Sequence, residues 1–314
     1  MVAGPQGLSF YGERPTNLSR QQTHMNTTVN IEIPQRIECE FESNNGIVLI
    51  QVLLNGKKRT FLLDSGAPFM TLNTRHVHPD HIEAGLLEFR GIGGGVQSSR
   101  ARITTFNWQG FKLRNSLVYA MDLAHLEREL GVEFHGLIGY RELMHFTLNI
   151  DYKAKRLTLW REFNPSDFTV LARIPFVLYN HLPVIRANIG KRGVKLGLDS
   201  GAAINLLDVN LLSSIEGFSP AGREEQLHGA GSNSVKVQHG RLTSTVIQGT
   251  KFNNMRVVWS DVSVIKHSLG DIDGLLGYEF LSKRRMAVSF TDNCIYLIRK
   301  KRGGSEVPGD ARED

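Results

Sequence analysis

The chain has 314 residues, which is enough for two domains of ordinary size or one large domain. Hydrophobic residues make up 41% of it and charged residues 22%, a composition that is typical of globular proteins and excludes a largely disordered chain. The formal net charge is +6, but the basic residues are dispersed and form no patch interleaved with aromatic residues, so we expect no nucleic-acid partner.

No apolar run approaches the roughly 18 residues that a membrane helix needs, and the first thirty residues lack the apolar core of a secretory signal. We therefore expect a soluble protein without a membrane span. Its compartment stays open, because a signal could have been removed. Two cysteines, Cys39 and Cys294, are too few for a disulfide scaffold. A single bridge between the two halves is possible, and two free thiols are the simpler expectation.

The chain begins and ends with polar segments. Residues 1–30 are rich in Gly, Ser, Thr, Asn and Gln and show little periodicity, which indicates a flexible N-terminal arm or a pro-segment. Residues 303–314 have the same character and predict a disordered tail.

The first half of the chain is predicted to be mostly β-strand. Two apolar runs at 47–54 and 59–63 are separated by Asn55-Gly56, the pattern of a β-hairpin with a tight turn. A helix is expected at 122–130, where leucines recur at spacings of three and four, and a shorter one at 141–145.

The second half repeats the first. Five short segments return in the same order, displaced by 135 to 139 positions, which predicts a tandem duplication with lobes at 31–163 and 167–302. The second lobe should therefore contain an equivalent hairpin, a less distinct helix after Asp261 and a short helix at 279–284. The paired segments are 36–37 with 173–174, 61–67 with 196–202, 89–93 with 227–231, 109–112 with 248–251, and 136–140 with 274–278.

One repeated segment carries reactive groups. Asp64-Ser65-Gly66 follows three apolar residues and returns as Asp199-Ser200-Gly201. Such a motif places a carboxylate at the end of a buried strand, and its glycine permits a tight turn. A single copy usually marks an ordinary β-turn, but two copies in equivalent places of a duplicated chain are more informative.

Two lobes related by an approximate two-fold axis would bring Asp64 and Asp199 together at that axis. Two carboxylates that close cannot both ionise easily, so the pair retains one proton over a useful pH range. The charged member can accept a proton from water while the protonated member donates to a carbonyl oxygen. The sequence thus predicts general acid–base hydrolysis.

The paired motifs resemble those of the pepsin and retropepsin class of aspartic peptidases. The resemblance rests on residues 62–67 with 137–139 and on residues 197–202 with 275–277, and it covers nearly all of 31–302. It implies a mainly β fold of two homologous β-barrel lobes, related by a pseudo-two-fold axis, with a few short helices. It also implies a peptide or protein substrate, no cofactor and a dyad that shares one proton.

The resemblance assigns further residues. The hydroxyls of Ser65 and Ser200 would bond across the axis and brace the two loops together with Gly66 and Gly201. Two glycine-rich segments would act as flaps that close over the substrate, one in each lobe, as in retropepsins. A phosphate-binding loop is the competing interpretation, and it fails because no Lys-Ser step follows either segment. The flap residues are Gly91, Ile92, Gly93 and Gly94 in the first lobe and Gly229, Ala230 and Gly231 in the second.

Histidines are the remaining candidates for chemistry. His76, His78 and His81 form a tract that could bind zinc, but the tract has no counterpart in the second half and includes a proline, so we expect a solvated surface loop and no metal. His135 has no acidic partner at a recognisable spacing, and we expect a structural role for it.

We therefore expect an aspartic endopeptidase that acts as a single chain. The first alternative is a catalytically silent peptide-binding module on the same scaffold. The second is an obligate dimer in which each lobe pairs with its copy in another molecule. Cleavage specificity, natural substrate and pH optimum are not readable from the sequence.

Overall fold

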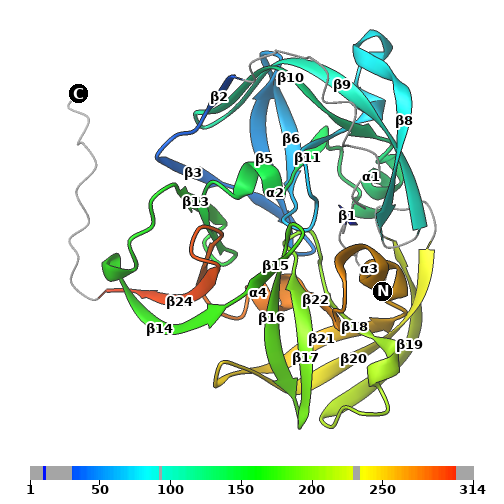
Figure 1. Cartoon of the computed structure of the whole chain (residues 1–314), viewed down its shortest axis with the longest axis vertical. Coiled ribbons are helices and arrows are strands. Elements are labelled where there is room, and N and C mark those ends of the chain that lie inside the picture. The colour runs from blue at the N-terminus through cyan, green and yellow to red at the C-terminus, as the bar shows by residue number, and fades with distance from the viewer. Residues whose placement is uncertain (1–9, 12–29, 92–93, 229–233, 302–314) are drawn as a thin grey trace.

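The structure is a computed structural model that describes residues 10–11, 30–91, 94–228 and 234–301 (Figure 1). The arm predicted at 1–30, apart from residues 10, 11 and 30, and the tail predicted at 303–314 lie outside the described residues. Figure 1 shows the strands of the first half above those of the second half, with a further sheet to one side.

Six strands of the first half close into a barrel. Each one is hydrogen-bonded to two neighbours, and the pairing of β5 with β9 closes the ring. In the order of pairing, the strands are β5 (Ile47–Leu54), β6 (Lys57–Leu63), β11 (Gly136–Ile138), β7 (Thr71–Asn73), β10 (Phe111–Met121) and β9 (Gly94–Trp108).

The second half repeats this ring. The pairing of β16 with β20 closes it, as the pairing of β5 with β9 closes the first. In the same order, its strands are β16 (Leu182–Ile189), β17 (Arg192–Leu198), β22 (Gly274–Leu276), β18 (Asn205–Asp208), β21 (Thr250–Ser260) and β20 (Ser234–Ile247). The prediction of a mainly β fold with two repeated barrels is confirmed.

A third sheet joins the two halves. Its order is β14 (Phe168–Pro175), β24 (Cys294–Lys300), β23 (Met286–Ser289), β12 (Thr147–Asp151), β13 (Arg156–Trp160) and β3 (Arg36–Glu40). The order is symmetric about the pair β12–β23, so the pseudo-two-fold axis passes between these strands. Cys39 and Cys294 lie in this sheet as free thiols, as expected.

The remaining strands extend the two barrel sheets. They are β1 (Phe10–Tyr11), β2 (Asn30–Glu32), β4 (Glu42–Asn44), β8 (Ile82–Gly91), β15 (Val177–Tyr179) and β19 (Phe218–His228). Among them, β8 lies between β1 and β9. The predicted hairpin turn between β5 and β6 is present, because Asn55 and Gly56 both have positive φ angles, 49° and 75°.

The four α-helices of the described residues are short. Helix α1 (Ala124–Leu130) falls within the predicted 122–130, and α3 (Ser263–Leu269) is its counterpart after Asp261. Helices α2 (Tyr140–Leu143) and α4 (Tyr278–Leu281) each begin one residue earlier than predicted and end before 145 and 284. Four single-turn 3₁₀ helices complete the fold: η1 (Thr74–His76), η2 (Pro79–His81), η3 (Pro165–Asp167) and η4 (Val209–Leu211).

The largest buried cluster of apolar side chains draws on both halves. It contains Phe61 and Trp108 from the first barrel, Phe252 and Trp259 from the second, and side chains of the shared sheet. Because burial of apolar surface is the main stabilising contribution to folding, the two halves support each other. Throughout the described segments, every helix falls short of the length and hydropathy that crossing a membrane would require.

Candidate active site

The two Asp-Ser-Gly loops follow equivalent strands. Asp64 comes directly after β6 and Asp199 directly after β17, and the last three residues of each strand are buried. A short strand pairs parallel to each of them and receives the hydrogen bond that the aspartate's own N–H donates. Asp64 N–H donates to Ile138 O at 3.0 Å, and Asp199 N–H donates to Leu276 O at 2.9 Å.

Each turn orients its own carboxylate. Oδ1 of Asp64 accepts hydrogen bonds from the backbone N–H groups of Gly66 and Ala67, at 2.9 and 3.0 Å. Oδ1 of Asp199 accepts one from Gly201 N–H at 2.8 Å. These hydrogen bonds to the backbone restrict the side-chain rotamer of each aspartate. Oδ2 of Asp64 is buried and receives no N–H from the described residues.

The following serines connect the two loops. Ser65 N–H donates to Ser200 Oγ, and Ser200 N–H donates to Ser65 Oγ, both at 2.9 Å. The Ser200 hydroxyl also donates to Leu63 O at 3.1 Å. Two residues that are 135 positions apart in sequence are thereby held together, and the two aspartates with them.

The two aspartates share one buried environment. Both side chains have 0% exposure. The Asp199 carboxyl group lies against Gly66, since a Cβ added to that glycine would be 2.5 Å from it. Burial raises the pKa of Asp64 well above its ordinary value, and the charge of Asp199 and a hydrogen bond to that carboxyl raise it further. The backbone N–H groups of Gly66 and Ala67 oppose this shift without cancelling it.

Helices α2 and α4 support the loops from behind. Tyr140 N–H donates to Ala67 O at 2.7 Å, and Tyr278 N–H donates to Ala202 O at 2.8 Å. The approach is so close that the residue directly before α4 must lack a side chain, because a Cβ on Gly277 would be 2.1 Å from Ala202 O. The repeated Gly-Tyr of the sequence therefore marks a packing contact with the Asp-Ser-Gly loops.

Sequence reasoning missed His181. Its side chain is buried, and its Nε2–H donates to Gly66 O at 2.8 Å, so the second half contacts the first loop directly. The position 135 residues earlier in the first half is Gly46, which has no side chain. The sequence could have indicated this residue, because the two repeats differ here just before the equivalent strands β5 and β16.

The predicted flaps are only partly described. Gly91 ends β8 and Gly94 begins β9, and these two residues are paired across the hairpin. Ile92 and Gly93 lie outside the described residues, as do Gly229, Ala230 and Gly231. In the second half, β19 and β20 pair up to His228 and Ser234, so both glycine-rich segments connect two antiparallel strands. Phe10, in β1, pairs with Gly91.

Comparison with known families agrees with this geometry. The family model described as aspartyl protease matches the chain twice, over residues 50–141 and 185–280, which together are more than half of the sequence. Each match includes one Asp-Ser-Gly loop and the Gly-Tyr segment packed behind it. No curated protein matches the chain. Since both halves match and both fold into the same barrel, the chain belongs to the aspartyl protease family, as a protein with two retropepsin-like lobes in one polypeptide.

Proposed function

We propose that the protein is an aspartic endopeptidase whose catalytic dyad, Asp64 and Asp199, is completed within a single chain. The observation that carries this proposal is the reciprocal hydrogen bonding of Ser65 and Ser200, which holds two fully buried carboxyl groups in one site. A protein that only binds peptides gains nothing from two buried carboxyl groups that repel each other when both are charged.

The proposed reaction uses the proton that the pair retains. The charged carboxylate takes a proton from a bound water as the water oxygen forms a bond to the scissile carbonyl carbon. The protonated carboxyl group donates its proton to the carbonyl oxygen, which gives a tetrahedral diol. The carboxyl group that took the proton from water then passes it to the amide nitrogen. As the carbon–nitrogen bond breaks, a diol hydroxyl gives its proton to the other carboxylate, and the pair again holds one proton. The net change is addition of one water across the peptide bond.

The substrate is expected to bind as an extended strand. Extended peptides are recognised through backbone hydrogen bonds, with side-chain pockets alternating along the chain. The hairpins β8–β9 and β19–β20 carry the glycine-rich segments proposed as flaps, and helix α3 of the second half contacts β8 of the first. Both carboxyl groups are fully buried, so the site has to open before a peptide can reach them, and we propose that these hairpins are the parts that move.

Hydrolysis of an unbiased peptide library, from about pH 3 to about pH 8, tests the proposal. The variants are Asp199→Asn and, as a matched control, Asp261→Asn, which changes an exposed aspartate that caps a turn through Ser263 N–H. We expect cleavage by the wild type and Asp261→Asn, none by Asp199→Asn, and inhibition by a statin-type transition-state mimic. No cleavage by folded wild-type protein at any pH would overturn the proposal in favour of a peptide-binding module.

Sedimentation with activity measured across the gradient tests the single-chain site. We expect activity to follow the monomer, because both aspartates and both bracing serines come from one polypeptide. Activity confined to a dimer would mean that each half pairs with its copy in a second molecule.

A further inference from the structure

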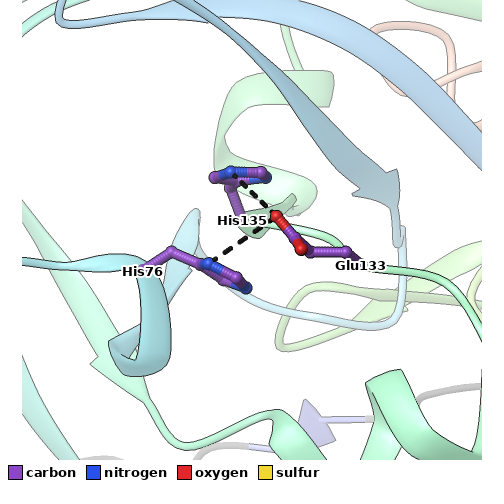
Figure 2. A group of neighbouring side chains, drawn as sticks. All are labelled: His76, Glu133 and His135. Atoms are coloured by element: carbon purple, nitrogen blue, oxygen red, sulfur yellow. Dashed lines mark ion pairs between the residues drawn. The ribbon is translucent and has the colours of Figure 1, made fainter.

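A second group of ionisable side chains lies in the first half of the chain, where His76, Glu133 and His135 converge (Figure 2). His76 ends η1, while the other two residues lie in the segment between α1 and β11. Nδ1 of His76 is 3.9 Å and Nε2 of His135 is 3.7 Å from the same Glu133 oxygen. One potential ligand atom from each residue lies within 4.8 Å of the other two.

This arrangement corrects two expectations from the sequence. The tract at 76–81 is not a uniform surface loop, because the His76 side chain is 16% exposed whereas that of His78 is 68% exposed. His135 does have an acidic neighbour, Glu133, two residues away. His76 is more than fifty positions away from the other two residues, so spacing along the sequence did not reveal the cluster.

A buried carboxylate orients His76. Its Nε2 lies 2.7 Å from Glu127 Oε1, and a carboxylate oxygen can only accept, so Nε2 carries the proton. Glu127 is itself held by Phe134 N–H at 3.0 Å and by the Arg75 guanidinium at 3.2 Å. In the neutral ring, which is the form that binds a metal, the lone pair is then on Nδ1, the nitrogen that faces Glu133. A histidine bound to a carboxylate through its other nitrogen is the usual arrangement around protein metal sites.

His135 is also held in place. Its backbone N–H donates to Thr60 O at 2.8 Å, and its carbonyl accepts from Asn73 N–H at 2.9 Å. Its ring is 4.5 Å from the His76 ring, centroid to centroid, and nearly parallel to it. Two imidazole ligands are thus positioned by the barrel, whereas the Glu133 side chain, 69% exposed, is free to adjust.

We propose that His76 Nδ1, Glu133 and His135 Nε2 bind a zinc ion, with a water molecule as the fourth ligand. Zinc is bound by nitrogen and oxygen ligands at about 2.0–2.1 Å in a tetrahedron, which requires ligand atoms roughly 3.4 Å apart. The separations from the Glu133 oxygen need to shorten by only a few tenths of an ångström. Imidazole ligands favour zinc, copper or nickel over calcium or magnesium.

The ion would connect two segments that flank the proposed dyad. Strand β7 leads into η1 and His76. His135 leads into β11, whose neighbour β6 ends directly before Asp64. Zinc would cross-link these segments and stabilise the first barrel. It takes no part in the hydrolysis proposed above, and the two proposals can fail separately.

Zinc titration of metal-stripped, full-length protein against a chromophoric chelator tests this site. We expect one zinc ion per chain, and visible absorption of a tetrahedral Co²⁺ derivative. Glu133→Gln, an exposed change, should weaken binding about tenfold or more, and His76→Gln should abolish it. The matched control is His78→Gln, from the same tract but outside the cluster, which should bind as the wild type does. Asp199→Asn should also bind zinc normally.

Glu127, the carboxylate that orients His76, allows a second test of the zinc site. Glu127→Gln leaves all three ligands in place and should weaken zinc binding by about 10- to 100-fold. Thermal denaturation without metal identifies any variant that fails to fold. The proposal is wrong if folded wild-type protein binds no stoichiometric zinc, if Glu133→Gln and His76→Gln bind as tightly as the wild type, or if His78→Gln removes binding. In the first case the cluster is only a hydrogen-bonded brace.

Discussion

Ser65 and Ser200 exchange two hydrogen bonds across the pseudo-two-fold axis, each donating its backbone N–H to the other's hydroxyl at 2.9 Å. Each serine directly follows one of the buried aspartates. The relative position of the two carboxyl groups therefore depends on a contact between loops from different halves of the chain.

Loss of either hydroxyl should destabilise the protein, because a buried N–H group is left without an acceptor. We expect each alanine substitution to cost about 1–3 kcal/mol of unfolding free energy. Ser200→Ala should cost more than Ser65→Ala, since the Ser200 hydroxyl also donates to Leu63 O. Urea denaturation of both single variants and the double variant measures these values. Ser214→Ala, which removes a local turn bond, is the control, and equal effects of all three single variants would contradict the prediction.

The pH dependence of stability should reflect the aspartate pair. Burial, followed by the charge of Asp199, raises the pKa of Asp64 above the ordinary value of 3.8. The native state thus keeps a proton that the unfolded state releases, and stability falls as the pH rises above that value. Asp199→Asn removes the repulsion, so it should be more stable than the wild type at about pH 8 and similar to it at about pH 3. Denaturation curves across this pH range measure the stability difference between the variant and the wild type. A variant less stable than the wild type at high pH would contradict the proposed repulsion between the two aspartates.

Gly66 should tolerate no side chain. A methyl group at this position would lie 2.5 Å from the Asp199 carboxyl group, which is closer than van der Waals contact allows. We expect Gly66→Ala to lower kcat at least about a hundredfold, because small displacements of reacting groups have effects of this size. Gly193→Ala is the control, since the nearest atom to its new methyl group is 3.6 Å away. Unchanged turnover by Gly66→Ala would mean that the loops are less closely packed than described.

Glu142 should make the protein less stable at neutral pH. Its side chain is buried in α2, and burial raises its pKa from 4.5 to about 7. Its stabilising contribution is complete below about pH 4.5 and is lost as the pH rises through about 7. Glu142→Gln should therefore be more stable than the wild type at about pH 8, by about 3 kcal/mol. Thermal and urea denaturation at both ends of this range measure the difference.

The equivalent residue in the second half supplies a control of opposite sign. Glu279 accepts a hydrogen bond from Arg256 Nε at 2.7 Å. Glu279→Gln removes this ion pair and should destabilise the protein at about pH 8, where Glu142→Gln stabilises it. If both variants shift stability in the same direction, the burial of Glu142 and the ion pair of Glu279 do not determine the sign of the stability change.

Most of the fold could be predicted because the chain is duplicated. The recurrence of the Asp-Ser-Gly and Gly-Tyr segments in one order predicted two equivalent mainly β lobes, and two apolar runs separated by Asn55-Gly56 predicted the first hairpin. Helix limits differed by one to three residues, because capping depends on contacts such as that of Tyr140 N–H with Ala67 O. The shared sheet was not predicted, since pairing of Thr147 with Ser289 connects strands far apart in sequence.

The sequence by itself determined the chemistry that is available: two Asp-Ser-Gly loops at the ends of buried strands, and the duplication that relates them. Local patterns suffice for this, because a motif and its repeat are properties of neighbouring residues. Only the tertiary structure decided which distant groups meet. It placed His181 against Gly66 and His76 beside His135, and it buried Asp64 and Asp199 completely. Such contacts depend on how the two halves pack, and long-range packing has no periodic signature in the sequence.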